Sequence, residues 1–167
     1  SGLDDAFISK FNNEGEIQWT RLLGTSEDEE GKSIAIWSDG SIYITGYTTG
    51  DLVDGEDNNG SFDVFICKYD SDGEKQWTKL LGTNEVDYGR GIAIDNNDSI
   101  YITGYTEGDL NGQSNSGGND AFLIKLSETS SPIVITKNDP STYYGSTWSG
   151  TAADDILVWF DGDDVID

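Results

Sequence analysis

The C-terminal segment carries the residues of this chain whose types and spacing best suit metal chemistry. Asp154-Asp155 is followed nine residues later by Asp163-Asp164, and each pair precedes two aliphatic residues. A nine-residue period of this kind predicts stacked turns that bring their carboxylates together. Calcium takes about six to eight oxygen ligands, which stacked turns can share. The candidate calcium ligands are Asp154, Asp155, Asp161, Asp163, Asp164 and Asp167.

The same segment resembles the haemolysin-type calcium-binding repeats of secreted bacterial proteins. The resemblance implies that Asp155 and Asp164 occupy the ligand position of two successive repeats. The chain departs from the family pattern at Ala153 and at Trp159-Phe160, where glycines normally allow the tight turn. An acidic tail that binds no metal is the alternative interpretation.

Composition argues against several function classes. The chain has 167 residues with 32 Asp and Glu, 9 Lys and Arg and no His, giving a formal net charge of -23. This charge repels phosphates, so we expect no nucleic acid partner. No stretch of about 18 apolar residues is present, so we expect no membrane insertion. Catalytic triads with a histidine base are unavailable, and the single Cys67 is expected in a buried strand.

An internal repeat dominates the rest of the chain and shows which elements must form. The segment Asp5–Lys10 recurs with small changes as Asp63–Lys68 and Asp120–Lys125, and Ser41–Thr48 recurs unchanged as Ser99–Thr106. Segments 5–52 and 63–110 are identical at more than half of their positions. They must therefore share one local fold.

Each repeat unit is predicted to form four short strands. In the first complete unit these are residues 31–36, 42–47, 64–69 and 75–81, which are rich in aromatic and β-branched residues and bounded by Gly, Asn and Asp. No segment shows a sustained helical period. The predicted fold is therefore all-β, with four-stranded units in tandem as in a β-propeller.

The repeat resembles the bacterial seven-bladed β-propeller repeat family over about residues 3–126. The residues that carry the resemblance are Gly-x-x-Ile-Ala-Ile, Ser-Ile-Tyr-Ile-Thr-Gly-Tyr-Thr, Asp-Ala-Phe-Ile-x-Lys and Gln-Trp-Thr-x-Leu-Leu-Gly. The resemblance implies a propeller fold and no reaction. It also implies an architectural unit of a large secreted or cell-surface bacterial protein, with a role in adhesion or display.

The chain divides into three predicted regions. Residues 1–126 form the propeller repeats, 127–149 a linker with an additional strand at 133–136, and 150–167 the start of the calcium-binding repeats. The propeller region amounts to about two blades, with incomplete units at both ends. Because propellers close with about four to eight blades, we expect either a fragment of a larger propeller or a ring of identical chains.

Side chains that recur in every unit are expected to hold the units together. Asp5, Asp63 and Asp120, with the Lys five residues later in each unit, are predicted to make structural hydrogen bonds or ion pairs. The recurring Trp and Tyr residues are predicted to pack between units. They are Trp19, Trp77, Tyr43, Tyr47, Tyr101 and Tyr105.

One aromatic residue does not recur, and it supports an alternative function. Trp37 aligns with Asp95 in the next unit, so an exposed indole could stack on a sugar ring. The alternative to a structural module is therefore a carbohydrate-binding or glycan-cleaving propeller. No two carboxylates outside the repeat have the spacing of an acid/base pair, so we do not expect an enzyme.

Overall fold

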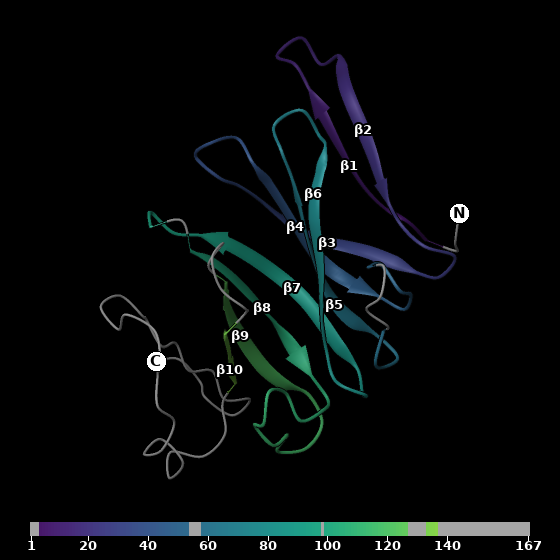
Figure 1. The fold of residues 1–167 in the computed structure, drawn as a ribbon, viewed down its shortest axis with the longest axis vertical. Helices are drawn as coiled ribbons and strands as arrows, with labels where there is room; N and C mark the ends of the chain where they lie inside the picture. Colours follow the sequence, from purple (N-terminus) through teal and green to yellow (C-terminus); the bar gives the residue numbers. More distant parts are fainter. Residues whose placement is uncertain (1–3, 54–57, 98, 127–132, 137–167) are drawn as a thin grey trace.

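The structure, a computed structural model, describes residues 4–53, 58–97, 99–126 and 133–136 (Figure 1). All the regular secondary structure in these ranges consists of β-strands, so the predicted all-β fold is confirmed. The strands are β1 (Ala6–Phe11), β2 (Ile17–Leu23), β3 (Glu29–Ile36), β4 (Ile42–Thr48), β5 (Asp63–Tyr69), β6 (Lys75–Leu81), β7 (Asp87–Ile94), β8 (Ile100–Thr106), β9 (Asp120–Leu126) and β10 (Ile133–Thr136).

The strands form three antiparallel sheets in which neighbours along the chain pair with one another. The N-terminal sheet is β1-β2, the middle sheet is β3-β4-β5-β6, and the C-terminal sheet is β7-β8-β9-β10. The strand predicted at 133–136 is present as β10. It pairs antiparallel with β9 and so supplies the fourth strand of its sheet.

The repeated sequence produces the same register in the middle and C-terminal sheets. Gly46 faces Phe65 across β4 and β5, as Gly104 faces Phe122 across β8 and β9. The glycine is required in this position because a Cβ on Gly46 would overlap the carbonyl oxygen of Glu30. This close approach explains why the repeated strand contains a glycine between Thr and Tyr.

Apolar side chains from alternate strand positions form two cores, one at each junction between sheets. At the first junction, Ala6, Ile8 and Leu23 of the N-terminal sheet pack against a face of the middle sheet that includes Phe65 and Cys67. At the second, Tyr43, Val64 and Ile66 pack against the corresponding face of the C-terminal sheet, which includes Ile100, Ile102, Phe122, Ile124 and Leu126. The predicted burial of Cys67 is confirmed.

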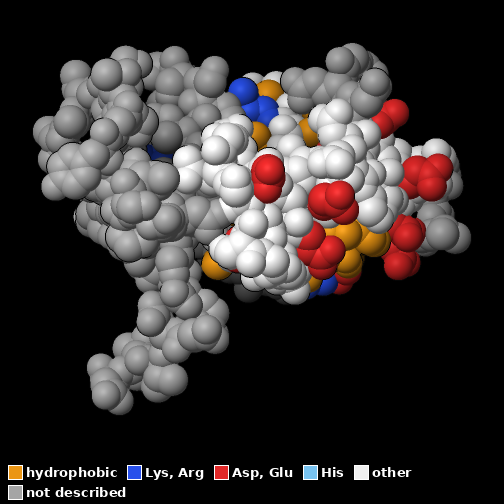
Figure 2. All heavy atoms as spheres, turned by 90° about the horizontal axis from the view of Figure 1, so that it is seen from below, with side chains coloured by type: hydrophobic (Ala, Val, Ile, Leu, Met, Phe, Trp, Pro, Cys, Tyr) orange, Lys and Arg blue, Asp and Glu red, His pale blue; other side chains and the backbone are white. Residues whose placement is uncertain are grey.

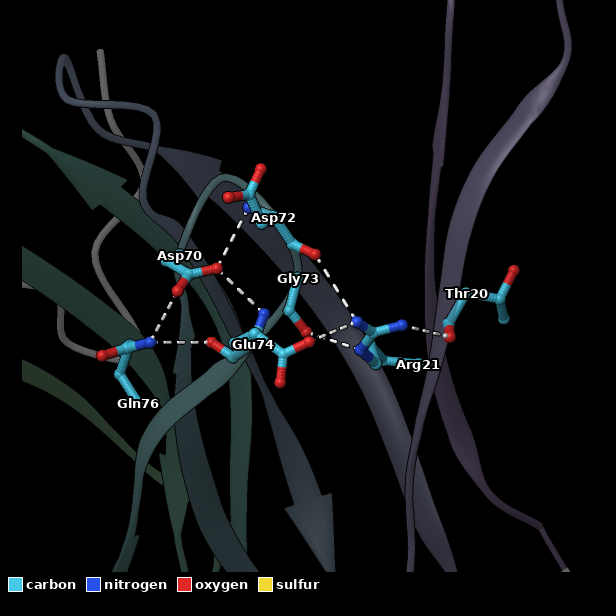
Figure 3. A network of polar contacts seen from close by, with 7 residues as sticks. All are labelled: Thr20, Arg21, Asp70, Asp72, Gly73, Glu74 and Gln76. Atoms are coloured by element: carbon cyan, nitrogen blue, oxygen red, sulfur yellow. Dashed lines mark hydrogen bonds and ion pairs between the residues drawn. The ribbon is translucent and has the colours of Figure 1, made fainter.

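A polar network joins the N-terminal sheet to the turn between β5 and β6 (Figure 3). The Arg21 Nε atom donates a hydrogen bond of 2.6 Å to the Gly73 carbonyl, and its Nη2 atom pairs with Glu74 at 2.7 Å. Lys10 donates to the Ser71 carbonyl of the same turn at 2.8 Å. Two strands of one sheet thus contact a single turn of the next.

The first strands of the middle and C-terminal sheets converge. Strand β7 contacts β3, β4 and β5, and the Ile92 amide donates to the Ser33 hydroxyl oxygen at 3.3 Å (Figure 1). This stacking of four-stranded antiparallel sheets, first strand beside first strand, is the relation of adjacent propeller blades. Within the described ranges, the structure has no helix long and apolar enough to cross a membrane.

Candidate functional site

The candidate site is a patch of rings and charges where the middle and C-terminal sheets meet, which we call the aromatic seam. The Tyr47 ring lies edge-on to Tyr88 of the next sheet, with centroids 4.5 Å apart. Phe62 contacts both rings, and Tyr105 lies 4.9 Å from Tyr88. All four rings are only partly buried. The seam comprises Glu30, Lys32, Tyr47, Phe62, Tyr88, Arg90 and Tyr105.

The sheet register explains why these side chains meet. Tyr47 lies opposite Glu30 in the β3-β4 pair, and Tyr88 opposite Tyr105 in the β7-β8 pair. Because side chains directly opposite in an antiparallel pair share a face, each pair contributes two neighbours to the seam. The approach of β7 to β4 then joins the two pairs.

Cationic side chains lie over the rings of the seam. The Arg90 guanidinium lies 5.1 Å from the centroids of both Tyr88 and Tyr105 and donates a 2.9 Å hydrogen bond to the Tyr105 hydroxyl. Lys32 lies 5.3 Å from the Tyr47 centroid. Such contacts hold the cations at fixed positions on a half-exposed surface.

Glu30 sets the electrostatics of one end of the seam. Its carboxylate pairs with Lys32 and accepts a hydrogen bond from the Tyr47 hydroxyl. These two contacts, Lys32 first, lower the pKa of Glu30, and the hydrogen bond to Glu30 raises the pKa of Tyr47 to about 12. Tyr47 is therefore a hydrogen-bond donor at neutral pH. The seam as a whole presents ring faces, a carboxylate and two cations. Such a set of groups can bind a ligand by non-covalent contacts.

A second recurring feature lies in the loops that enter the strands. An acid at the first position of a strand accepts a hydrogen bond from the amide four residues earlier, which closes the loop. The donor and acceptor residues are Thr25 and Glu29, Asn59 and Asp63, Thr83 and Asp87, and Ser116 and Asp120. We call these contacts acid clasps. They show that Asp63 and Asp120 make structural hydrogen bonds, as predicted.

The lysines of the repeat do not contact the Asp of their own unit in these clasps. The Lys68 ammonium lies over the rings of Trp37 and Tyr43, and that of Lys125 lies over Tyr101. In an extended strand, residues five apart lie far beyond ion-pair distance. The repeated Asp and Lys therefore act at opposite ends of each strand.

Most of the predicted aromatic packing is found. Trp19 packs against the first core, and Trp77 and Tyr43 belong to the second. Trp37 also packs against the second core and lies 5.8 Å from Tyr43, so it is held between sheets. Trp37 is partly buried, as the rings of the seam are, so the structure does not give it the fully exposed indole that the sequence suggested.

The predicted calcium ligands Asp154, Asp155, Asp161, Asp163, Asp164 and Asp167 all lie outside the described residues. In the part of the chain that the structure does describe, no group of three or more His, Cys, Asp or Glu side chains is placed to hold a metal. On the face shown in Figure 2, acidic side chains lie beside exposed hydrophobic side chains.

Sequence reasoning missed the aromatic seam as a site. It treated Tyr47 and Tyr105 as packing residues and did not single out Tyr88 or Arg90. The sequence does contain a signal for this site, which is a departure from the repeat. Tyr88 stands where the preceding unit has Glu30, and two residues later both units have a cation, Lys32 or Arg90. A break in an otherwise regular repeat marks a position that folding alone does not require.

Comparisons with known proteins agree with this architecture. Residues 18–52 and 76–111 match the family model described as "Beta-propeller repeat". The chain is 31% identical over 132 residues to "Regulatory protein FlaEY" of Caulobacter vibrioides, a match that covers 73% of this chain and 14% of that protein. It is 26% identical over 154 residues to "Uncharacterized WD repeat-containing protein L264" of Acanthamoeba polyphaga mimivirus, covering 83% of this chain and 11% of that protein.

The chain therefore spans about an eighth of the length of these curated relatives. Its two matched segments contain β-propeller repeats, and the described strands form the corresponding blades.

Proposed function

We propose that this chain is a non-catalytic interaction module whose open blade faces are covered by further blades. The observation that carries the proposal is the unequal burial of equivalent residues. Ile34 and Ile36 of β3 are 53% and 68% exposed, whereas the equivalent Ile92 and Ile94 of β7 pack against the second core. Residues of one repeat position are thus covered in one blade and open in the other.

The missing cover is the first half of a blade. Ile92 and Ile94 are covered by a complete sheet, but the sheet before β3 consists of β1 and β2 alone in the described chain. Two more strands beside β1 would cover Ile34 and Ile36. They would also pair with the open edge of β1, which otherwise remains a template for association.

The outer face of the N-terminal sheet is open in the same way. Phe7 and Leu22 form a cross-strand pair that is 67% and 71% exposed. The equivalent of Phe7 in the middle sheet, Phe65, is fully buried, and the equivalent of Leu22, Leu80, packs against the first core. At the first junction, the N-terminal sheet covers Phe65. The partner that would cover Phe7 and Leu22 is therefore another blade of the same repeat.

The chain also carries the complementary face. Ala6 and Ile8 pack into the first junction, and the equivalent Ala121 and Leu123 at the far end of the chain lie outside both cores. A second copy can therefore dock its N-terminal sheet on the C-terminal sheet of the first, head to tail. Repetition of that contact gives a ring if the rotation closes.

Light scattering of the chain, with Phe7→Ser/Leu22→Ser as the variant, tests this proposal. We expect the parent to associate through its open faces and the variant to run as a folded monomer. A parent that is a stable, folded monomer at all concentrations would refute association between copies. An exposed variant away from the open faces, Asp72→Ala in the turn between β5 and β6, should leave the association unchanged.

We further propose that the module acts in adhesion or display on the bacterial surface or in a secreted protein. Calcium bound by Asp155, Asp164 and the neighbouring acids of the tail would then order the C-terminal segment. The acidic composition supports calcium binding, because divalent cations relieve the self-repulsion of a chain with net charge -23. The name of one relative, a regulatory protein, describes no reaction.

A second candidate function is carbohydrate binding at the aromatic seam. The partly buried rings of Tyr88 and Tyr105, with Arg90 across them, offer stacking faces next to hydrogen-bond donors. A glycan array with the parent, Tyr88→Ala and Trp37→Ala tests it. We expect a saccharide signal that Tyr88→Ala abolishes and a folded Trp37→Ala keeps. Absence of any signal from the parent would count against this function.

A further inference from the structure

Two buried carboxylates meet at the junction of the middle and C-terminal sheets. Phe62 and Val86 form a parallel bridge, and the Asp87 amide donates to the Phe62 carbonyl at 2.8 Å. The next residue on each side, Asp63 and Asp87, therefore lies beside the other with its side chain on the same side of the bridge. Both residues are 1% exposed.

Each of these carboxylates has one oxygen in an acid clasp and one without a partner. Asp63 Oδ2 accepts from the Asn59 amide at 2.8 Å, and Asp87 Oδ2 accepts from the amide and hydroxyl of Thr83 at 2.6 and 2.9 Å. The Oδ1 atoms of both are buried and accept no hydrogen bond. An unpaired buried carboxylate oxygen is costly, so its presence on two adjacent residues requires an explanation.

The unpartnered oxygen of Asp63 points toward the loop that carries Asp87. A Cβ on Gly82, at the start of that loop, would overlap Asp63 Oδ1. The carbonyl oxygens of Thr83 and Glu85 in the same loop come close to Gly60, near the Asn59–Asp63 clasp. Several oxygen atoms of two loops thus converge at this junction.

The first junction shows how the same position looks when its acid is satisfied. There the equivalent of Asp87 is Glu29, one methylene longer. Glu29 Oε1 accepts from the hydroxyls of Thr25 and Thr48 at 2.8 and 2.7 Å, and Oε2 accepts from the Thr25 amide at 2.6 Å.

The shorter Asp87 does not make the second hydroxyl contact. Thr106, the equivalent of Thr48, bonds to Gly108 as Thr48 bonds to Gly50, but it adds no bond to Asp87 like the one from Thr48 to Glu29. The change from Glu29 to Asp87 therefore leaves one oxygen of this acid without a donor at the second junction. One methylene thus separates the fully hydrogen-bonded Glu29 from Asp87, which keeps one unpartnered oxygen.

We propose that Asp63 and Asp87 bind a hard divalent cation, of which Ca²⁺ is the example, between the middle and C-terminal sheets. Two carboxylates provide the two negative charges that such an ion neutralises, whereas a single shared proton would leave one buried charge. Calcium also binds carbonyl and hydroxyl oxygens. At this junction, Thr83 and Glu85 provide carbonyl oxygens and Thr106 provides a hydroxyl oxygen. The bound ion stabilises the contact between the two blades.

The test is thermal unfolding of the full chain in chelator and in Ca²⁺ at constant ionic strength. Asp155→Asn/Asp164→Asn serves as the background, so that ions bound by the tail do not contribute. We expect Ca²⁺ at about 100 times its Kd to raise the Tm of this background by about 5–10 °C. Calorimetric titration of the same protein with Ca²⁺ should show one site.

Asp87→Glu is the decisive variant because it copies the satisfied junction. Glu at this position should reach Thr106 as Glu29 reaches Thr48, so the variant should fold and lose both the Tm shift and the calorimetric site. Asp63→Asn should lose them as well. Two results would overturn the proposal: no Ca²⁺ response in the background protein, or an equal response in Asp87→Glu. The first would assign the junction to a shared proton, and the second would assign the ion to another site.

Discussion

Replacing Phe65 with Ala should destabilise this protein far more than the same change at Phe7, although the two residues occupy one repeat position. Phe65 is fully buried against the N-terminal sheet, and Phe7 is 67% exposed. Truncating a buried Phe costs about 3–5 kcal/mol, from the lost transfer free energy and the cavity left behind. Phe7 keeps only about a third of its surface buried, so about 0.5–1 kcal/mol is expected there if burial scales with area.

Urea unfolding of the two variants, followed by tryptophan fluorescence, measures this difference. The free energies of unfolding should differ between Phe65→Ala and Phe7→Ala by about 2–4 kcal/mol at equal m-values. The measurement belongs at low protein concentration, where copies of the chain do not associate. Equal losses for the two variants would refute the reasoning, because they would show that the Phe7 face is covered in the folded chain.

Two further predictions follow from single contacts. Gly82→Ala should lower the free energy of unfolding by about 1–3 kcal/mol, because the added Cβ would overlap the Asp63 carboxylate. The loss should be smaller in an Asp63→Ala background. An unchanged loss in that background would contradict this cause. The other prediction is a spectrophotometric titration of tyrosine. Burial also raises the pKa of Tyr69, so the titration uses a Tyr69→Phe background. There it should show a tyrosine with a pKa of about 12 that is absent when Tyr47→Phe is added, and Glu30→Gln should return it toward about 10 because the neutral phenol loses its charged acceptor. A tyrosine with a pKa of about 12 that survives Glu30→Gln in the Tyr69→Phe background would count against the hydrogen bond as its cause.

The strands themselves could be predicted because their signals are local. Alternation of Ile and Tyr along residues 42–47, with Gly and Asp at the turns, is sufficient to place a strand and its boundaries within a residue or two. The near-identity of two long segments then requires the same register in both. The short strand at 133–136 was also visible as an apolar run, and its pairing with β9 followed from its place in the chain.

The aromatic seam could not be predicted in this way. Tyr47 and Tyr88 are far apart in the chain, and they meet only because β7 packs beside β3 and β4. Tyr47 also recurs as Tyr105, so repetition suggested a packing role for both. The pairing of Asp63 with Asp87 depends in the same way on the contact between two loops of different units.

Sequence alone therefore determined the all-β class, the repeat unit and its strands, because alternation, turn residues and duplication are properties of neighbouring positions. Only the tertiary structure decided which copies of a repeated residue are buried and which are open. It also decided which side chains of separate units come into contact. Identical sequence positions differ in this respect because burial depends on the adjacent sheet, and the sheet before β3 in this chain has two strands where the sheet before β7 has four.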